Sequence, residues 1–190
     1  MQLLKDKILS DGRAINSDVL KVDSFITHQV DIELMEAMAE DFAEHFKNEG
    51  ITKVVTIESS GIAPAMMTAK AMKVPLVILK KQPSKILNGS LLQTEVTSFT
   101  TAKTYELTAS PKFLKAEDHC LIIDDFLANG EAVTGAIRLL RMAHATIGGV
   151  GILIEKTFQP GRKKLEGAGF EIYSLARIKS MKSGQIEFED

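Results

Sequence analysis

The chain has 190 residues, 45% of them hydrophobic, with 23 basic and 25 acidic side chains and a formal net charge of −2. This length suits one domain with a sizeable core, and the near balance of charge argues against nucleic acid as the main partner. No apolar run is long enough to cross a bilayer, the first residues lack the apolar stretch of a signal peptide, and a single Cys excludes an internal disulfide. The sequence therefore predicts a soluble, cytoplasmic, single-domain protein without a membrane or nucleic-acid partner.

Hydrophobic periodicity predicts helices that alternate with strands. In the helix expected over residues 31–50, apolar side chains recur at spacings of three and four, and Gly50 is expected to end it. These apolar residues are Met35, Met38, Phe42 and Phe46. The other expected helices span residues 3–11, 61–73, 131–145 and 161–169, and the expected strands span residues 53–59, 74–81, 119–124, 148–156 and 170–178. This order predicts an α/β fold, a parallel central sheet with helices on both faces.

Residues 82–111 differ in texture from the rest of the chain. The stretch 90–110, SLLQTEVTSFTTAKTYELTAS, alternates and is rich in Thr. This pattern predicts two antiparallel strands joined by a mobile turn near residues 100–103. The last six residues, QIEFED, are expected to pair as an edge strand.

Three of the expected strands end in unusual polar sequences. They run into ESSGIAP (58–64), DDFLANGEA (124–132) and EKTFQPGR (155–162). In a parallel sheet such ends lie at the carboxyl edge, where ligands bind. The first two combine a loop of small residues with a helix start, where backbone N–H groups and the helix dipole attract anions. Two such loops at one edge predict a substrate with phosphates at two places.

Each loop taken alone is also an ordinary turn with a helix cap. Turn formation does not explain Asp124 and Asp125, because adjacent carboxylates repel each other and each resists desolvation. Neither loop matches G-x-x-x-x-G-K-[ST], which disfavours a P-loop nucleoside triphosphatase, and no G-x-G-x-x-G opens a helix, which disfavours a dinucleotide-binding fold. The four His residues lack metal-ligand spacing, so no protein-built metal site is expected.

The stretch LIIDDFLANGEA, residues 121–132, resembles the phosphoribosyl pyrophosphate signature of type I phosphoribosyltransferases. Residues 17–31, 55–65 and 151–162 extend the resemblance over nearly the whole chain and are similar to the bacterial xanthine branch of this family. The resemblance implies purine salvage. Phosphoribose would pass from 5-phospho-α-D-ribose 1-diphosphate (phosphoribosyl pyrophosphate) to N9 of xanthine, giving xanthosine 5′-monophosphate and pyrophosphate.

The resemblance also implies a domain organisation, a metal ion and an oligomeric state. One phosphoribosyltransferase domain would occupy residues 1–190, with a small N-terminal hood over the base (1–30) and a flexible antiparallel hairpin (90–110). Mg²⁺ would bind through phosphoribosyl pyrophosphate, and the enzyme would be a homodimer. A non-catalytic regulator that senses phosphoribosyl pyrophosphate is the alternative, but such regulators carry an extra DNA-binding domain, for which this chain has no spare length. A purely structural protein would leave the paired aspartates unexplained.

The resemblance assigns site residues to the phosphoribosyl group. Asp124 and Asp125 would be catalytic, since they would accept hydrogen bonds from the ribose 2′- and 3′-hydroxyls and favour a cation-like sugar. Where many relatives have Gly followed by Thr or Ser, this chain has Glu131 and Ala132, so the Glu131 side chain is expected to point away from the phosphate. The 5′-phosphate loop would comprise Ala128, Asn129, Gly130, Glu131 and Ala132, and the pyrophosphate loop Ser59, Ser60 and Gly61.

Other residues are assigned to the base and to the rims of the site. Lys156 would donate to the 6-oxo group of xanthine and Phe158 would stack on the ring, although a lysine paired with an acid and a core phenylalanine are the ordinary alternatives. Leu20 and Thr27 would cover the base, where the residue types alone predict plain core and plain surface. Lys80 and Lys81 would either face pyrophosphate or simply be exposed. Outside the site, Lys163 and Lys164 are expected on a solvated helix face.

Overall fold

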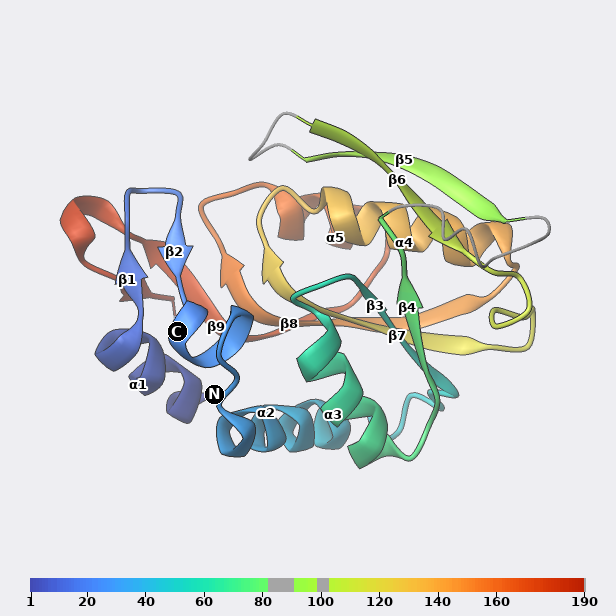
Figure 1. Ribbon diagram of the computed structural model, residues 1–190, viewed down its shortest axis with the longest axis horizontal. Helices are drawn as coiled ribbons and strands as arrows, with labels where there is room; N and C mark the ends of the chain where they lie inside the picture. Colours follow the sequence, from blue (N-terminus) through green and yellow to red (C-terminus); the bar gives the residue numbers. More distant parts are fainter. Residues whose placement is uncertain (82–90, 99–102, 190) are drawn as a thin grey trace.

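The computed structural model describes residues 1–81, 91–98 and 103–189, with a six-stranded sheet at its centre (Figure 1). The strand order is β10-β9-β8-β7-β3-β4, and every neighbouring pair is parallel except β10–β9. The strands are β3 (Lys53–Ile57), β4 (Leu76–Leu79), β7 (His119–Leu127), β8 (Thr146–Lys156), β9 (Ile172–Ser180) and β10 (Glu187–Phe188). The predicted parallel sheet and the predicted edge strand at the end of the chain are both confirmed.

Helices cover both faces of this sheet, as predicted (Figure 1). One layer holds α2 (Ile32–His45) and α3 (Ile62–Met72), and the other holds α4 (Glu131–Met142) and α5 (Gly161–Gly167). Side chains of β7 alternate between two cores: Leu121 and Ile123 pack with α2 and α3, whereas Cys120 and Ile122 pack with α4. A strand buried on both faces must be apolar at every position, which is why residues 120–123 read as a continuous hydrophobic run.

Helix α2 shows how a sequence pattern becomes a packed element. The Asp31 side chain caps it by accepting a hydrogen bond from the Leu34 backbone N–H at 3.1 Å. The helix ends at His45, earlier than predicted, and Gly50 (φ +67°) lies in the turn that follows. The four predicted core residues, Met35, Met38, Phe42 and Phe46, are fully buried.

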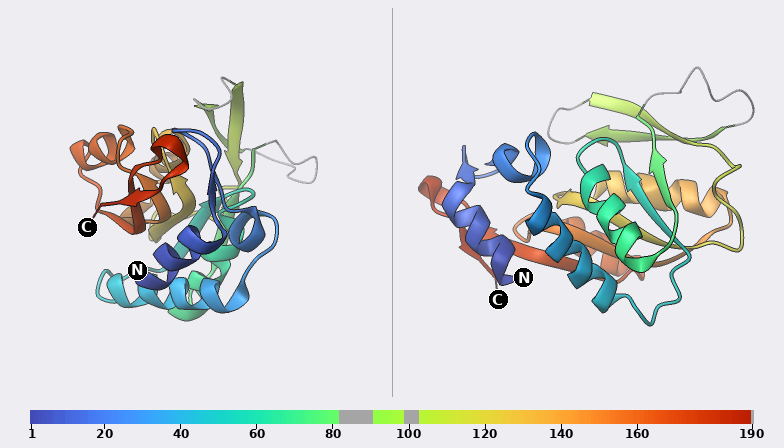
Figure 2. Two further views of the ribbon diagram at one scale, coloured as in Figure 1. Left: turned by 90° about the vertical axis from the view of Figure 1, so that its left-hand side faces the viewer. Right: turned by 60° about the horizontal axis from the view of Figure 1, so that its bottom comes forward.

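The N-terminal segment packs at the β9–β10 end of the sheet (Figure 2). It comprises α1 (Gln2–Asp11), a two-stranded ribbon of β1 (Arg13–Ala14) and β2 (Leu20–Lys21), and a π-helical turn (Asp23–Thr27). Between the two ribbon strands, the Asn16 side chain accepts hydrogen bonds from the backbone N–H groups of Asp18 and Val19, both at 2.8 Å. The sequence predicted α1 but not the ribbon.

The predicted antiparallel hairpin is present as β5 (Leu92–Ser98) and β6 (Lys103–Ala109). Its expected turn near residues 100–103 lies largely outside the described residues. The hairpin rests on α4, where Gly135 leaves room for it: a Cβ at Gly135 would lie 2.4 Å from Val96 Cγ2. It is joined to the main sheet by paired backbone hydrogen bonds between Lys80 and Thr108.

Across the described residues, no helix combines the length and the apolar character needed to cross a membrane.

Candidate active site

A cavity of about 570 Å³ opens where β3 and β7 end, under the β5–β6 hairpin. Both predicted anion-binding loops and both predicted catalytic aspartates contribute to its wall. Its lining includes Glu58, Ser59, Ser60, Lys81, Val96, Thr104, Tyr105, Asp124, Asp125, Phe126, Ala128, Asn129, Gly130, Glu131 and Ala132. The fold therefore brings together residues that are about 70 positions apart in the sequence.

Asp124 and Asp125 both belong to this wall. Asp124 Oδ1 accepts the Asp125 backbone N–H at 3.0 Å, and Asp125 Oδ1 accepts the Phe126 backbone N–H at 2.9 Å. Within the described residues, neither carboxylate forms an ion pair. Burial raises the pKa of Asp124 well above its ordinary value, and the neighbouring Asp125 charge raises it further. Burial likewise raises the pKa of Asp125. A ligand that supplies hydroxyl or cationic groups would relieve both costs.

The loop after β7 has the form of a phosphate site. Gly130 adopts a left-handed conformation (φ +77°) directly before α4, which glycine does at little cost. The first turn of α4, whose backbone N–H groups lack intrahelical partners, borders the cavity. The Glu131 carboxylate lies 2.7 Å from the Lys164 ammonium on α5. The loop can therefore offer backbone donors to an anion while the acidic side chain is occupied elsewhere.

The loop after β3 packs closely against Thr56 and Asp124. Gly61 has no room for a side chain, since a Cβ there would lie 2.3 Å from Thr56 Oγ1 and 2.9 Å from Asp124 Oδ1. The peptide bond between Glu58 and Ser59 is cis. The loop thus packs directly against the acidic pair.

The two lysines after β4 have different roles in this geometry. The Glu58 carboxylate accepts the Lys81 backbone N–H at 2.6 Å and pairs with Lys80 Nζ at 3.3 Å. Lys81 lines the cavity, and its ammonium lies 5.2 Å from the centre of the Tyr105 ring. Of the lysine pair, Lys81 is the one placed to face an anion in the cavity.

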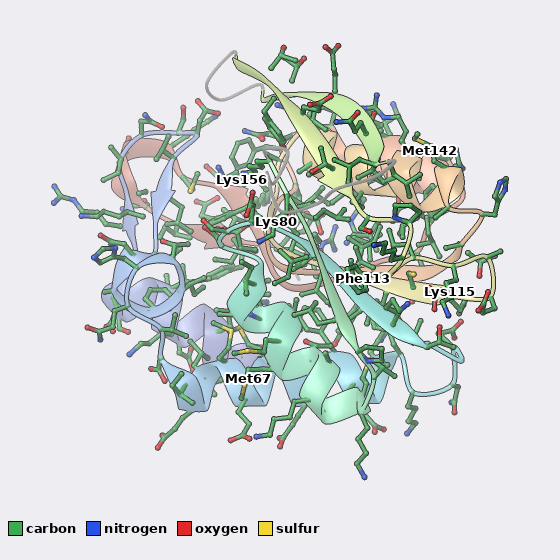
Figure 3. All side chains as sticks on the ribbon, turned by 45° about the vertical axis from the view of Figure 1, so that its right-hand side comes forward. Met67, Lys80, Phe113, Lys115, Met142 and Lys156 are labelled. Atoms are coloured by element: carbon green, nitrogen blue, oxygen red, sulfur yellow. The ribbon has the colours of Figure 1, made fainter. Side chains whose placement is uncertain are left out.

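Lys156 ends β8 beside the cavity rather than in its wall. Figure 3 labels it together with Lys80, which follows β4 at the same edge of the sheet. Its ammonium lies 5.3 Å from the centre of the Phe126 ring and donates a hydrogen bond to the backbone carbonyl of Asp18. Burial lowers the pKa of Lys156, although the charges of Asp18 and Asp125 oppose that shift. The head group is thus half-buried between the N-terminal ribbon and the acidic pair.

The other three residues assigned to the base are not among those lining the cavity. Leu20 belongs to the hydrophobic core at 7% exposure, and Thr27 is exposed. Phe158 is 42% exposed, so its core alternative is wrong. A contact between these side chains and a base stays a prediction.

Several cavity residues were not assigned from the sequence. Tyr105, on β6, faces the acidic pair, and burial together with the Asp124 charge raises the pKa of its hydroxyl. Val96 stands opposite Tyr105 in the hairpin register and also lines the cavity. Strand alternation could have placed Tyr105 and Val96 on one face, but not shown which face meets the site. Phe126 could have been singled out by its place directly after the aspartates.

Among the described residues, no cluster of three or more His, Cys, Asp or Glu side chains could hold a metal ion. Asp124 and Asp125 form no ion pair in the part of the chain that the structure describes, and carboxylate oxygens are ligands suited to a divalent cation carried in by a polyanionic substrate.

The chain belongs to the phosphoribosyltransferase family, since residues 25–171 match the family model of the phosphoribosyl transferase domain. A relative from Agathobacter rectalis named xanthine phosphoribosyltransferase is 65% identical over 99% of this chain and 98% of its own length. A relative from Clostridium botulinum named xanthine phosphoribosyltransferase 1 is 58% identical over 99% of both chains.

Solved structures give the same fold. The adenine phosphoribosyltransferase of Giardia lamblia in complex with 9-deazaadenine has a TM-score of 0.78 at 23% identity and covers 92% of this chain and 97% of its own. The adenine phosphoribosyltransferase of Rhodothermus marinus has a TM-score of 0.76 at 24% identity and covers 93% and 99%. At these identities the likeness concerns the fold alone, the type I phosphoribosyltransferase fold.

Proposed function

We propose that this protein transfers phosphoribose from phosphoribosyl pyrophosphate to xanthine, forming xanthosine 5′-monophosphate and pyrophosphate in purine salvage. One observation carries the chemistry: a single cavity joins two loops suited to anions across an acidic pair that forms no ion pair within the described residues. The full-length relatives at 58–65% identity support xanthine as the base.

The proposed reaction is a substitution at C1 of the ribose. The loop from Ala128 to Ala132 holds the 5′-phosphate through backbone N–H groups, and the loop from Ser59 to Gly61 holds the pyrophosphate. As the bond from C1 to the pyrophosphate oxygen breaks, N9 of the base supplies the electron pair for the new bond. Asp124 and Asp125 accept hydrogen bonds from the 2′- and 3′-hydroxyls and stabilise the positive charge on the sugar.

The base is proposed to lie between the acidic pair and the N-terminal segment. One of the three ammonium donors of Lys156 is used by the Asp18 carbonyl, which leaves others for the 6-oxo group of xanthine. A cation at this place favours the anionic form of the base. Phe158 would stack on the ring, and Leu20 and Thr27 would cover it.

The proposal includes Mg²⁺, a homodimer and a cytoplasmic location. Mg²⁺ would arrive bound to phosphoribosyl pyrophosphate and neutralise charge on the leaving group. Asp124 and Asp125 lie in the same cavity as the pyrophosphate loop and would present negative charge to the complex.

An assay for pyrophosphate release tests the function. The protein is incubated with phosphoribosyl pyrophosphate, Mg²⁺ and xanthine, guanine or hypoxanthine, and we expect the highest kcat/KM for xanthine. Binding of phosphoribosyl pyrophosphate without release would favour a sensor, and neither binding nor release would contradict both.

A further inference from the structure

Helix α5 is built against the back of the 5′-phosphate loop. The Gly161 backbone N–H donates to the Ala128 carbonyl at 2.9 Å. The contact is close on both sides: a Cβ at Gly161 would lie 2.3 Å from the Ala128 carbonyl oxygen, and one at Gly130 would lie 3.3 Å from Gly161 Cα. The start of α5 therefore has a fixed position relative to the loop.

Glu131 is the feature of this loop that needs an explanation. It opens α4 and its residue lines the cavity, so a side chain that carries a carboxylate belongs to the loop proposed to bind a phosphate with a charge of about −2. Like charges at such short range oppose binding. The loop can bind phosphate well only if the Glu131 charge is turned aside or cancelled.

Lys164 meets this requirement. It is the fourth residue of α5, and its Nζ lies 2.7 Å from Glu131 Oε1, with both side chains partly exposed. Arg162, also on α5, donates hydrogen bonds to the Glu155 carboxylate at 2.6 and 2.7 Å and to the Glu166 carboxylate at 2.7 Å. Lys163 forms no ion pair within the described residues. Lys164 is thus the cation of this helix that Glu131 contacts.

We propose that Lys164 is a positioning residue for the 5′-phosphate: its ammonium holds the Glu131 carboxylate off the loop and cancels its charge, so that backbone N–H groups alone face the phosphate. This inference rests on the proposed function in one respect, the assignment of the loop to a phosphate. It gives a function to a lysine that the sequence places on an ordinary solvated face.

Binding of ribose 5-phosphate, measured by calorimetry, tests the pair without requiring turnover. Lys164→Ala should weaken binding about fivefold, on the scale of a screened interaction between partly exposed charges, and the deficit should shrink as salt is added. Combining Lys164→Ala with Glu131→Gln should recover most of the loss, because the unpaired negative charge is then gone. Lys164→Arg should also restore binding. Lys163→Ala, one residue away on the same helix, is the matched control and should match wild type.

Each other outcome overturns the inference. A double variant as weak as Lys164→Ala would mean that Lys164 contacts the phosphate itself. Unchanged affinity in Lys164→Ala would mean that the pair has no role, and a wild type that does not bind ribose 5-phosphate would mean that the loop is not a phosphate site. Failure of the proposed function is distinguishable, since it would appear as absent pyrophosphate release while the ribose 5-phosphate series still follows the expected order.

Discussion

Asp124 and Asp125, which we propose to be catalytic, also affect stability. Their pKa values are raised by burial, so the folded state binds protons more tightly than the unfolded state. Stability should therefore fall as pH rises from the ordinary value of 3.8 through the folded-state pKa, because the folded protein must then carry charges that it disfavours. Above the folded-state pKa the charged pair opposes folding, and a bound substrate that donates hydrogen bonds to it would offset this cost.

Asp124→Asn and Asp125→Asn should separate these two effects. Each change should reduce kcat/KM about 10- to 100-fold, since a charge-assisted hydrogen bond contributes about 1.5–3 kcal/mol. Each should also increase the free energy of unfolding at pH 8, and increase it less at pH 5, because the removed cost grows with ionisation. Steady-state kinetics and urea unfolding at both pH values provide the measurements. A folded double variant with wild-type turnover would show that the acidic pair is not catalytic.

Lys156 offers a second test at the scale of one side chain. Lys156→Ala should raise KM for xanthine about 10- to 100-fold, the effect of losing one hydrogen bond to a charged group, and leave KM for phosphoribosyl pyrophosphate nearly unchanged. Lys156→Gln keeps a donor without the charge and should also be impaired, most clearly where xanthine is ionised. Hypoxanthine is harder to deprotonate and should show a smaller loss.

The control for Lys156 is Lys179→Ala, which removes an exposed lysine on the neighbouring strand β9. It should leave both Michaelis constants at wild-type values. Equal losses for xanthine and hypoxanthine in Lys156→Ala would instead assign Lys156 to the fold or to the phosphates.

A contact between two residues can be predicted from the sequence when the residues are close together in the chain. The acidic pair and the loop from Ala128 to Ala132 form one continuous stretch, so their proximity was predictable. The contact between Glu131 and Lys164 joins residues 33 positions apart, and the contact between Lys156 and Asp18 joins residues 138 apart. Such contacts depend on how helices and loops pack, and no periodicity encodes them.

At the scale of elements, an ion pair ties α5 to the end of β8. Glu155 is 1% exposed and accepts hydrogen bonds from Arg162 Nε and an Arg162 terminal nitrogen at 2.7 and 2.6 Å, and from the Ser174 hydroxyl at 2.6 Å. Burial alone would raise the pKa of Glu155, but these donors outweigh it and hold the pKa below its ordinary value. The tie fixes the end of the strand that carries Lys156 and the helix that carries Lys164.

Glu155→Gln should therefore destabilise the protein by about 3 kcal/mol, the scale for removing one charge of a buried ion pair. The difference from wild type should shrink as pH falls below 4.5, because a carboxylate with a lowered pKa contributes its stability above the unfolded-state value and loses it as it is protonated. Urea unfolding measures both effects. Glu166→Gln removes the exposed partner of Arg162 and should cost less than about 1 kcal/mol. Equal costs for the two variants would contradict a special role for Glu155.

Elements with a clear hydrophobic pattern were predictable, and the short N-terminal ribbon was not. All the predicted strands of the sheet and all five predicted helices are present. The sequence did not predict the ribbon of β1 and β2, because each strand has only two residues and the turn between them depends on hydrogen bonds to the Asn16 side chain. The helix predicted over residues 31–50 is longer than α2, because Gly50 ends the turn that follows the helix rather than the helix itself.

The whole molecule places its chemistry at one edge because its strands are parallel. Three strand ends that carry polar sequence, at β3, β7 and β8, are neighbours in the sheet order, so two loops and Lys156 converge. The sequence predicted this edge. It could not show that the hairpin would lie over α4 with Tyr105 facing the acidic pair, since that arrangement depends on the small volume of Gly135 on a distant helix.

This arrangement leads to a prediction about the hairpin as a cover. A cation-like sugar would react with water, so the site should close during transfer. Val96 and Tyr105 already line the cavity, and residues 99–102, between their strands, lie outside the described part of the chain. We expect residues 94–105 to vary in conformation without ligand and to close over the bound sugar. Trypsin cleavage after Lys103 should therefore slow markedly when a phosphoribosyl pyrophosphate analogue and Mg²⁺ are added.

Cleavage after Lys112 provides the internal control for this experiment. Lys112 lies in an exposed turn beyond β6, away from the residues that line the cavity. Ligand that closes the hairpin should protect Lys103 and leave the rate at Lys112 unchanged. Equal protection at both sites would mean that ligand stabilises the protein globally, because both cleavages would then follow the same unfolding equilibrium. No protection at Lys103 would mean that the hairpin does not close over the bound ligand.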